Sequence, residues 1–121
     1  MSKSLSLLLT PNEERAVNSF VERLFDRYPD RIRQVVLFGS KARGDSGVWS
    51  DIDILVITDD EDWRFQHAIS DVASRVSLEN DVLIGPRVVG QERWGRMRKE
   101  RFSLYRNIAA EGLPLEPVSA L

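Results

Sequence analysis

The stretch that decides the fold is GSKARGDSGVWSDID, residues 39–53. It places a Gly-Ser step, Gly39-Ser40, ten residues ahead of an Asp-x-Asp step, Asp51-Ile52-Asp53. A run rich in branched apolar residues precedes this stretch at 32–38, and another overlaps its end at 51–58. Runs of this kind are typical of buried strands. The stretch is therefore expected to connect two strands.

The two aspartates are expected to share one face of the second strand, because side chains alternate along a strand. Their carboxylates would then lie about 6–7 Å apart, while Ile52, Ile54 and Val56 point the other way, into the core. Two carboxylates this close repel each other, so one is expected to have a raised pKa unless a positive group lies between them. A magnesium ion relieves that repulsion and also accepts phosphate oxygens. Asp51 and Asp53 are therefore candidate metal ligands.

The Gly-Ser step is a candidate phosphate site. Gly39 lets the backbone come close to a ligand, and free N–H groups at a helix start bind phosphate. The Ser40 hydroxyl adds a donor, and Lys41 and Arg43 are near enough in sequence to help neutralise a triphosphate.

The residues before this stretch predict a helix. Thr10 can cap it, Pro11 suits its first turn and Glu13 completes a capping box. Apolar residues then recur at helical spacing, and Pro29 ends the helix.

The residues after this stretch predict a helix with an apolar face from Trp63 to Val76, a strand over 81–89 and a last helix over 91–111. Gly85-Pro86 interrupts the strand, which favours an edge or a bulge. After the last helix, Pro114 and Pro117 leave an irregular tail. The expected class is α/β (α+β), in the order α-β-α-β-α-β-α with a small three-stranded mixed sheet.

Asp81 is the third candidate carboxylate, because it begins the third expected strand. If that strand pairs beside Asp51-Ile52-Asp53, its carboxylate lies about 5 Å away across the sheet. Three carboxylates and a triphosphate could hold two metal ions roughly 3.5–4 Å apart. Asp81 would then also be placed to act as the base for an attacking hydroxyl.

The bulk composition fits one domain over residues 1–121, and the family resemblance described below covers its core of about 10–112. There are no cysteines, which excludes thiolate metal sites and cysteine nucleophiles. The net charge of −2 provides no overall positive potential that would attract nucleic acid. The apolar run at 5–9 is too short for a membrane span, so a cytoplasmic protein is expected.

These residues closely resemble the minimal nucleotidyltransferases of the DNA polymerase beta-like superfamily. The resemblance rests on the Gly-Ser and Asp-x-Asp steps, on Ser50 directly ahead of the aspartates and on an ending with Glu111-Gly112. It implies a nucleoside triphosphate substrate, ATP above all, with Mg²⁺, two ions in number. The metal carboxylates implied are Asp51, Asp53 and Asp81, with the nearby Glu79 open as an alternative to Asp81. The nucleotide-binding residues implied are Gly39 and Ser40 for the β- and γ-phosphates, with Lys41, Arg43 and Ser50 beside them.

Three functions remain open at this point. Family members of this size often pair with a HEPN toxin as its antitoxin, which implies transfer of AMP to a hydroxyl of that protein. The second is a catalytically silent module that neutralises a partner by binding, and the third is a transferase for a small molecule such as an aminoglycoside. A docking patch for a partner is expected around Trp94, Arg96, Arg98 and Phe102. Trp49 is a candidate contact for a base or a partner, and homo-oligomerisation stays open.

Overall fold

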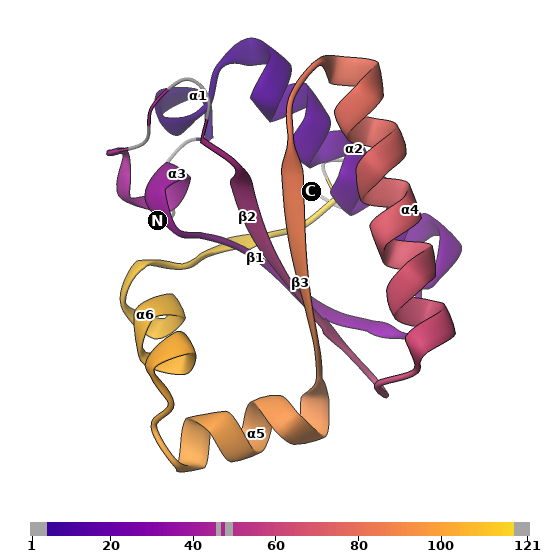
Figure 1. The fold of residues 1–121 in the computed structure, drawn as a ribbon, viewed down its shortest axis with the longest axis vertical. Helices are drawn as coiled ribbons and strands as arrows, with labels where there is room; N and C mark the ends of the chain where they lie inside the picture. The colour runs from indigo at the N-terminus through magenta and orange to yellow at the C-terminus, as the bar shows by residue number, and fades with distance from the viewer. Residues whose placement is uncertain (1–4, 46, 48–49, 118–121) are drawn as a thin grey trace.

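The computed structural model describes residues 5–45, 47 and 50–117 (Figure 1). Over these ranges the chain forms six helices and four strands. The helices are α1 Leu5–Leu8, α2 Pro11–Arg27, α3 Ser40–Arg43, α4 Trp63–Asn80, α5 Gln91–Lys99 and α6 Ser103–Glu111. The strands are β1 Ile32–Phe38, β2 Ile52–Thr58, β3 Ile84–Gly90 and β4 Leu113–Leu115. The predicted α/β class is confirmed.

The strands form one mixed sheet in the order β3-β2-β1-β4. Strand β1 is antiparallel to β2 and β4, whereas β2 and β3 are parallel. The sheet therefore has four strands rather than the three predicted, because part of the expected irregular tail forms β4 and pairs with residues 35–37 of β1. Pro114 is tolerated in β4 since an edge strand has an N–H side that needs no partner. Pro86 likewise lies in an edge strand, β3, as its sequence context predicted.

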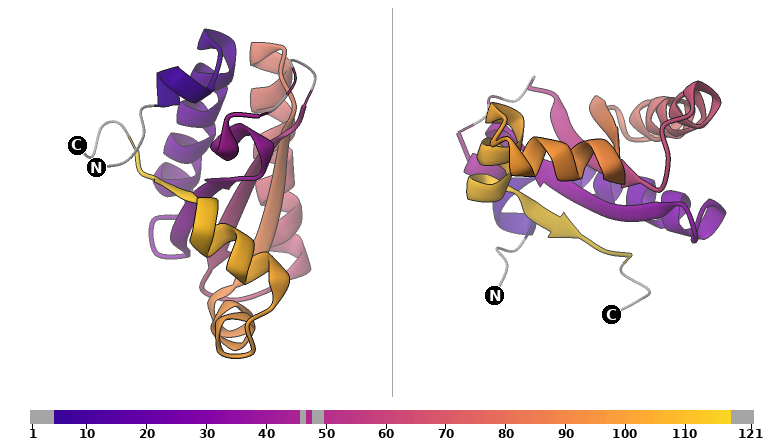
Figure 2. Two further views of the ribbon diagram at one scale, coloured as in Figure 1. Left: turned by 90° about the vertical axis from the view of Figure 1, so that its left-hand side faces the viewer. Right: turned by 90° about the horizontal axis from the view of Figure 1, so that it is seen from below.

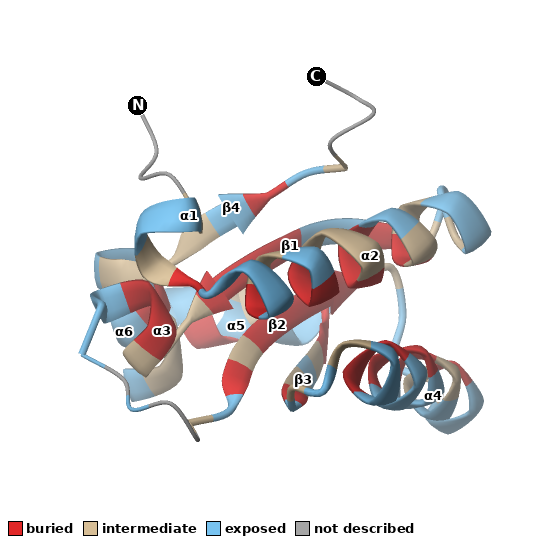
Figure 3. Ribbon diagram, turned by 90° about the horizontal axis from the view of Figure 1, so that it is seen from above, coloured by how far each residue is buried: buried red, intermediate tan, exposed pale blue. Residues whose placement is uncertain are grey.

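One face of the sheet packs against α2 and α4 (Figure 3). Helix α2 begins as predicted: the Thr10 side chain accepts a hydrogen bond from the Glu13 N–H, and the Glu13 side chain accepts one from the Thr10 N–H. Apolar side chains of both helices meet Ile52, Ile54 and Val56 of β2 in the main core. The expected inward orientation of these three residues is confirmed, which leaves Asp51 and Asp53 to the opposite face.

The opposite face carries α5 and α6, which were predicted as one helix over 91–111. That prediction is wrong: the chain turns at residues 100–102, where Arg101 adopts a left-handed φ of 56°. One straight helix of this length would extend about 30 Å. The turn instead lets Met97 of α5 and Ile108 of α6 enter the same second core beneath them. Trp94 and Tyr105 meet across the turn with ring centroids 5.3 Å apart.

The two ends of the sheet differ (Figures 1 and 2). Helix α3 and the first residues of β2 lie at one end, and α5 lies at the other, after the last residue of β3. The apolar N-terminal run forms α1 and buries Leu9 in the main core. No helix within the described ranges is long and apolar enough to cross a bilayer.

Candidate active site

The Gly-Ser and Asp-x-Asp steps meet at one end of the sheet because β1 and β2 are antiparallel. The register pairs Phe38, the last residue of β1, with Asp53. Gly39 follows with a left-handed φ of 77°, which favours glycine. A Cβ on Gly39 would overlap the Asp53 carboxylate and lie 3.2 Å from its Cγ. The chain therefore turns into α3 directly against an acidic side chain, and only glycine leaves room for it.

The two aspartates converge on the surface of β3. The residue paired with Asp53 across the sheet is Gly85. The point where a Cβ on Gly85 would lie is 3.8 Å from an Asp53 carboxylate oxygen and 4.0 Å from an Asp51 carboxylate oxygen. Asp51 is exposed and Asp53 is partly buried. Both carboxylates thus face one open spot, which glycine keeps clear.

The pKa of Asp53 is raised, as was predicted for one member of the pair. Burial raises the pKa of the Asp53 carboxyl above its ordinary value of 3.8, the neighbouring Asp51 charge raises it further, and the Arg43 charge lowers it. Burial is the largest of these three causes, and the effect of the Asp51 charge exceeds the opposing effect of the Arg43 charge. A divalent cation between the two carboxylates would reverse this, and the chemistry of the donor set fits magnesium.

The predicted position of Asp81 is wrong. Strand β3 starts at Ile84 rather than at residue 81, and Asp81 instead forms the C-cap of α4 in the left-handed conformation, with φ 54° and ψ 46°. The sheet position beside Asp53 therefore belongs to Gly85. Over the described part of the chain, no three Asp, Glu or His side chains form a group able to hold a metal ion. A metal at Asp51 and Asp53 would need further oxygens from a ligand or from solvent.

Lys41 is also placed differently from the prediction. Its side chain is 3% exposed, and its ammonium group lies 2.5 Å from a carboxylate oxygen of Glu13, itself buried in α2. The same ammonium group donates a hydrogen bond of 3.2 Å to the Gly47 carbonyl. The Lys41 ammonium group thus links α3 to α2 and to the loop that follows α3. In this position the ammonium group is directed at Glu13 and at the Gly47 carbonyl rather than at the open surface.

Arg43 remains at the surface and is held by two carboxylates. Its Nε donates to Asp45 at 3.2 Å, and its Nη1 donates to both oxygens of Glu111, each at 3.1 Å. Glu111 also accepts a hydrogen bond of 3.3 Å from the Gly39 N–H. These contacts raise the pKa of Arg43, with Glu111 as the largest cause. Sequence reasoning used Glu111 only as part of a family-like ending and missed this contact, because no local spacing relates residue 111 to residue 39.

The two serines of the predicted set differ in their contacts. The Ser50 hydroxyl accepts a hydrogen bond of 3.1 Å from the Gly47 N–H, so it closes the turn before β2. The partly buried Ser40 hydroxyl has no hydrogen-bond partner in the described part of the chain and is available to a ligand. Trp49, predicted to contact a base or a partner, lies outside the described residues.

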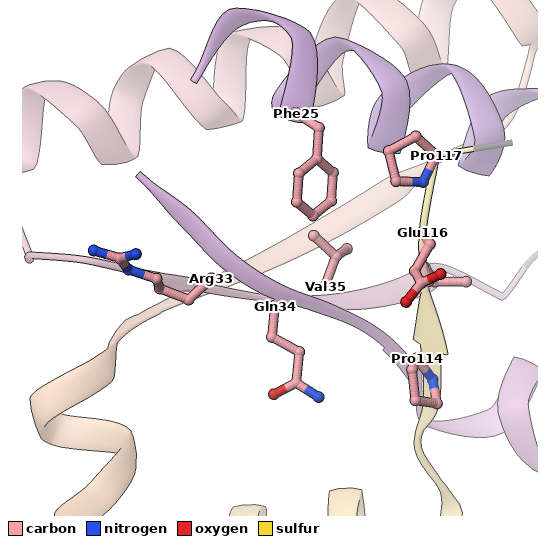
Figure 4. A pocket seen from close by; sticks show the side chains of 8 residues that line it. Phe25, Arg33, Gln34, Val35, Pro114, Glu116 and Pro117 are labelled. Carbon is pink, nitrogen blue, oxygen red and sulfur yellow. The ribbon is translucent and has the colours of Figure 1, made fainter. Parts of the chain in front are cut away.

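A separate pocket of about 480 Å³ lies at the β4 edge of the sheet (Figure 4). Phe25 of α2, Val35 of β1 and Pro114 of β4 contribute apolar lining, and Arg33 and Glu116 contribute charge. None of these residues belongs to the constellation around Asp53. The pocket therefore adds nothing to that site.

Known proteins are similar to this chain in sequence and in fold. Residues 17–109 match the family model described as "Nucleotidyltransferase domain". A Methanocaldococcus jannaschii protein named "Putative protein adenylyltransferase MJ0604" is 39% identical over 101 residues, covering 84% of this chain and 95% of that protein.

Solved structures extend the comparison. A structure described as a "putative minimal nucleotidyltransferase" is 25% identical, with a TM-score of 0.54 and coverage of 93% of this chain and 97% of that one. A chain from a toxin–antitoxin structure with AMP-PNP has 20% identity and a TM-score of 0.54, over 85% of this chain and 76% of that one. A chain from an MntA–HpeT toxin–antitoxin mutant has 22% identity and a TM-score of 0.51, over 83% and 72%. Below 25% identity, the last two bear on the fold alone.

Proposed function

This chain belongs to the nucleotidyltransferase domain family, and from that membership we propose that it transfers AMP from ATP to a hydroxyl group of a protein. The observation that carries the proposal is the packing of Gly39 against Asp53. It brings the turn proposed to bind phosphate and the carboxylate pair proposed to bind metal to the same end of the sheet. The name of the M. jannaschii relative supports adenylyl transfer to a protein.

The carboxylate pair would hold the metal. Asp51 and Asp53 face one open spot over Gly85, where burial and the neighbouring Asp51 charge raise the pKa of Asp53. A magnesium ion bound there supplies positive charge close to the reacting phosphate. Because Mg²⁺ favours octahedral oxygen coordination and two protein carboxylates cannot complete it, the nucleotide phosphates would provide further ligands.

The turn after β1 would hold the phosphates. The Ser40 hydroxyl is available as a donor, and Arg43 lies close enough to lower the pKa of Asp53 by its charge. A guanidinium binds phosphate oxygens through charge-assisted hydrogen bonds. In the transfer, the acceptor oxygen forms a bond to the α-phosphorus and the bond from that phosphorus to the β-phosphate oxygen breaks. Pyrophosphate leaves, and the proton of the acceptor hydroxyl passes to solvent.

The acceptor is proposed to be a protein partner of the toxin–antitoxin kind, of the HEPN class. The toxin–antitoxin chains that share this fold are the source of this proposal, and the assay below tests it. A docking surface is available on α5 and the turn after it, where Arg96 and Arg98 are exposed and the Phe102 side chain is half exposed. This surface and the carboxylate pair lie at opposite ends of β3, which extends about 20 Å. A docked acceptor must therefore reach along α6 toward Asp53.

A transfer assay with ATP labelled on the α-phosphate tests the proposal. The purified chain is incubated with Mg²⁺ and the product of the neighbouring gene, with Asp53→Asn as the inactive control. Label is expected on the partner with the wild type and not with the variant. Label on an aminoglycoside but on no protein would favour the small-molecule alternative. If the wild type binds and neutralises the partner yet transfers no label, the chain acts by binding alone.

A further inference from the structure

The Glu111 carboxylate is hydrogen-bonded to both ends of the turn that forms the proposed phosphate site. It accepts from the Gly39 N–H where the turn begins and from the Arg43 guanidinium where it ends. The Glu111 side chain is 19% exposed, so these hydrogen bonds are partly shielded from water. No other residue of α6 has a hydrogen bond to this turn in the described part of the chain.

Strand pairing explains how Glu111 reaches the site. Strand β4 pairs with β1 so that Leu113 is opposite Leu37 and Pro114 opposite Val36. Continued by two residues, the same antiparallel register sets Glu111 opposite Gly39. Gly112 allows this close approach, because a Cβ there would lie 2.7 Å from a methyl group of Val36.

The contacts of Arg43 leave one edge of its guanidinium available. Nε is used by Asp45 and Nη1 by Glu111, while Nη2 has no partner among the residues that the structure describes. Two carboxylates on two different nitrogens prevent the planar group from rotating. A long side chain that is fixed before binding loses less conformational entropy when the ligand arrives.

We propose that Glu111 is a positioning residue for the triphosphate: it fixes Arg43 and the Gly39 backbone so that the Nη2 edge of Arg43 meets the phosphates. The inference rests on the proposed nucleotidyltransferase function. Glu111 itself does not touch the nucleotide in this arrangement. It also gives α6, which lies between the docking surface and the site, a direct contact with the phosphate-binding turn.

Nucleotide affinity tests this role. Binding of Mg²⁺ with a non-hydrolysable ATP analogue is measured by calorimetry for the wild type, Glu111→Ala, Glu111→Gln and the control Glu116→Gln, an exposed residue just after β4. Glu111→Ala is expected to weaken binding about tenfold, because a guanidinium bond is lost and Arg43 becomes mobile. Glu111→Gln keeps an acceptor oxygen and should recover most of the affinity, and Glu116→Gln should bind like the wild type.

A double variant separates positioning from general damage. With Arg43→Ala as the background, Glu111→Ala should weaken binding clearly less than it does in the wild-type background, since only its hydrogen bond from the Gly39 N–H is left to lose. Tighter binding by Glu111→Ala would overturn the proposal, because Glu111 would then be a competitor of the phosphates. Wild-type affinity in Glu111→Ala would overturn it as well.

A nucleotide-free measurement keeps this inference separate from the proposed function. The Arg43 Nη1–H resonance of the wild type should exchange slowly with water and should broaden in Glu111→Ala, because Nη1 donates to the Glu111 carboxylate. If the wild type binds no Mg–ATP at all, the proposed function fails while this resonance still reports whether Glu111 holds Arg43. An unchanged resonance would overturn the positioning role whatever the nucleotide result.

Discussion

The Asp53 carboxylate occupies the space that a side chain on Gly39 would need. Gly39 also has a left-handed φ of 77°, so a substitution there is unfavourable twice, once in the backbone and once through contact with Asp53. This relationship joins the proposed phosphate-binding turn to the strand that carries the candidate metal ligands. It also makes the geometry of the candidate site sensitive to a single methyl group.

Gly39→Ala is therefore expected to lower the free energy of unfolding by about 1–3 kcal/mol and to weaken metal binding by displacing Asp53. Urea denaturation and Mn²⁺ titration measure the two effects. Gly95→Ala is the matched control: a Cβ there meets no atom within 4 Å, so stability should rise by up to about 1 kcal/mol. Equal stability of Gly39→Ala and the wild type would contradict the close approach.

Asp53→Asn is expected to abolish metal-dependent nucleotide binding while raising the melting temperature of the metal-free protein. The pKa of Asp53 lies above its ordinary value of 3.8, so the folded state binds the proton more tightly than the unfolded chain. The ionised carboxylate therefore lowers the free energy of unfolding. This cost is complete at pH values above the pKa of the folded state, and it is absent at pH values well below 3.8. The gain at pH 7, on the order of 1–2 °C for a carboxylate in partial contact with solvent, should vanish near pH 3. Thermal melts in EDTA at both pH values measure it.

Asp81→Asn is the companion variant for the third predicted carboxylate. Asn tolerates the left-handed conformation of a helix C-cap, so the fold should be unchanged. Since Gly85 rather than Asp81 pairs with Asp53, metal affinity should fall less than tenfold. Mn²⁺ titration with ATP compares the two aspartates, and a loss as large as that of Asp53→Asn would restore Asp81 as a metal ligand.

Lys41→Met is expected to destabilise the protein by about 3–5 kcal/mol, because it leaves the buried Glu13 carboxylate without its partner. Pairing it with Glu13→Gln should restore part of that loss, which urea denaturation of the single and double variants measures. ATP affinity of the folded fraction should change little. A large loss of ATP affinity at unchanged stability would instead return Lys41 to the phosphate site.

Ser40→Ala is expected to weaken binding of the Mg–ATP analogue by about 1–2 kcal/mol, the range for a hydrogen bond to a charged group. Stability should not fall, since the hydroxyl has no hydrogen-bond partner in the described part of the chain. Ser70→Ala, on the exposed side of α4, is the control for calorimetry. A covalent nucleotide on Ser40 in the mass spectrum would show a nucleophile rather than a phosphate contact.

The sequence by itself determined the features that depend on local periodicity. Because side chains alternate along β2, Ile52 lies in the core and Asp51 and Asp53 lie on the other face. Helix α2 begins at the capping box of Thr10, as expected. These features follow from the geometry of one strand or one helical turn. Neighbours in the sequence suffice to specify them.

Only the tertiary structure decided which distant residues meet. The parallel register of β3 put Gly85 beside Asp53, burial paired Lys41 with Glu13, and β4 carried Glu111 to Arg43. The physical reason is that a side chain's partner is set by strand register and helix packing. A shift of one residue in a register exchanges the faces of a whole strand, and residue spacing within GSKARGDSGVWSDID carries no information about that choice.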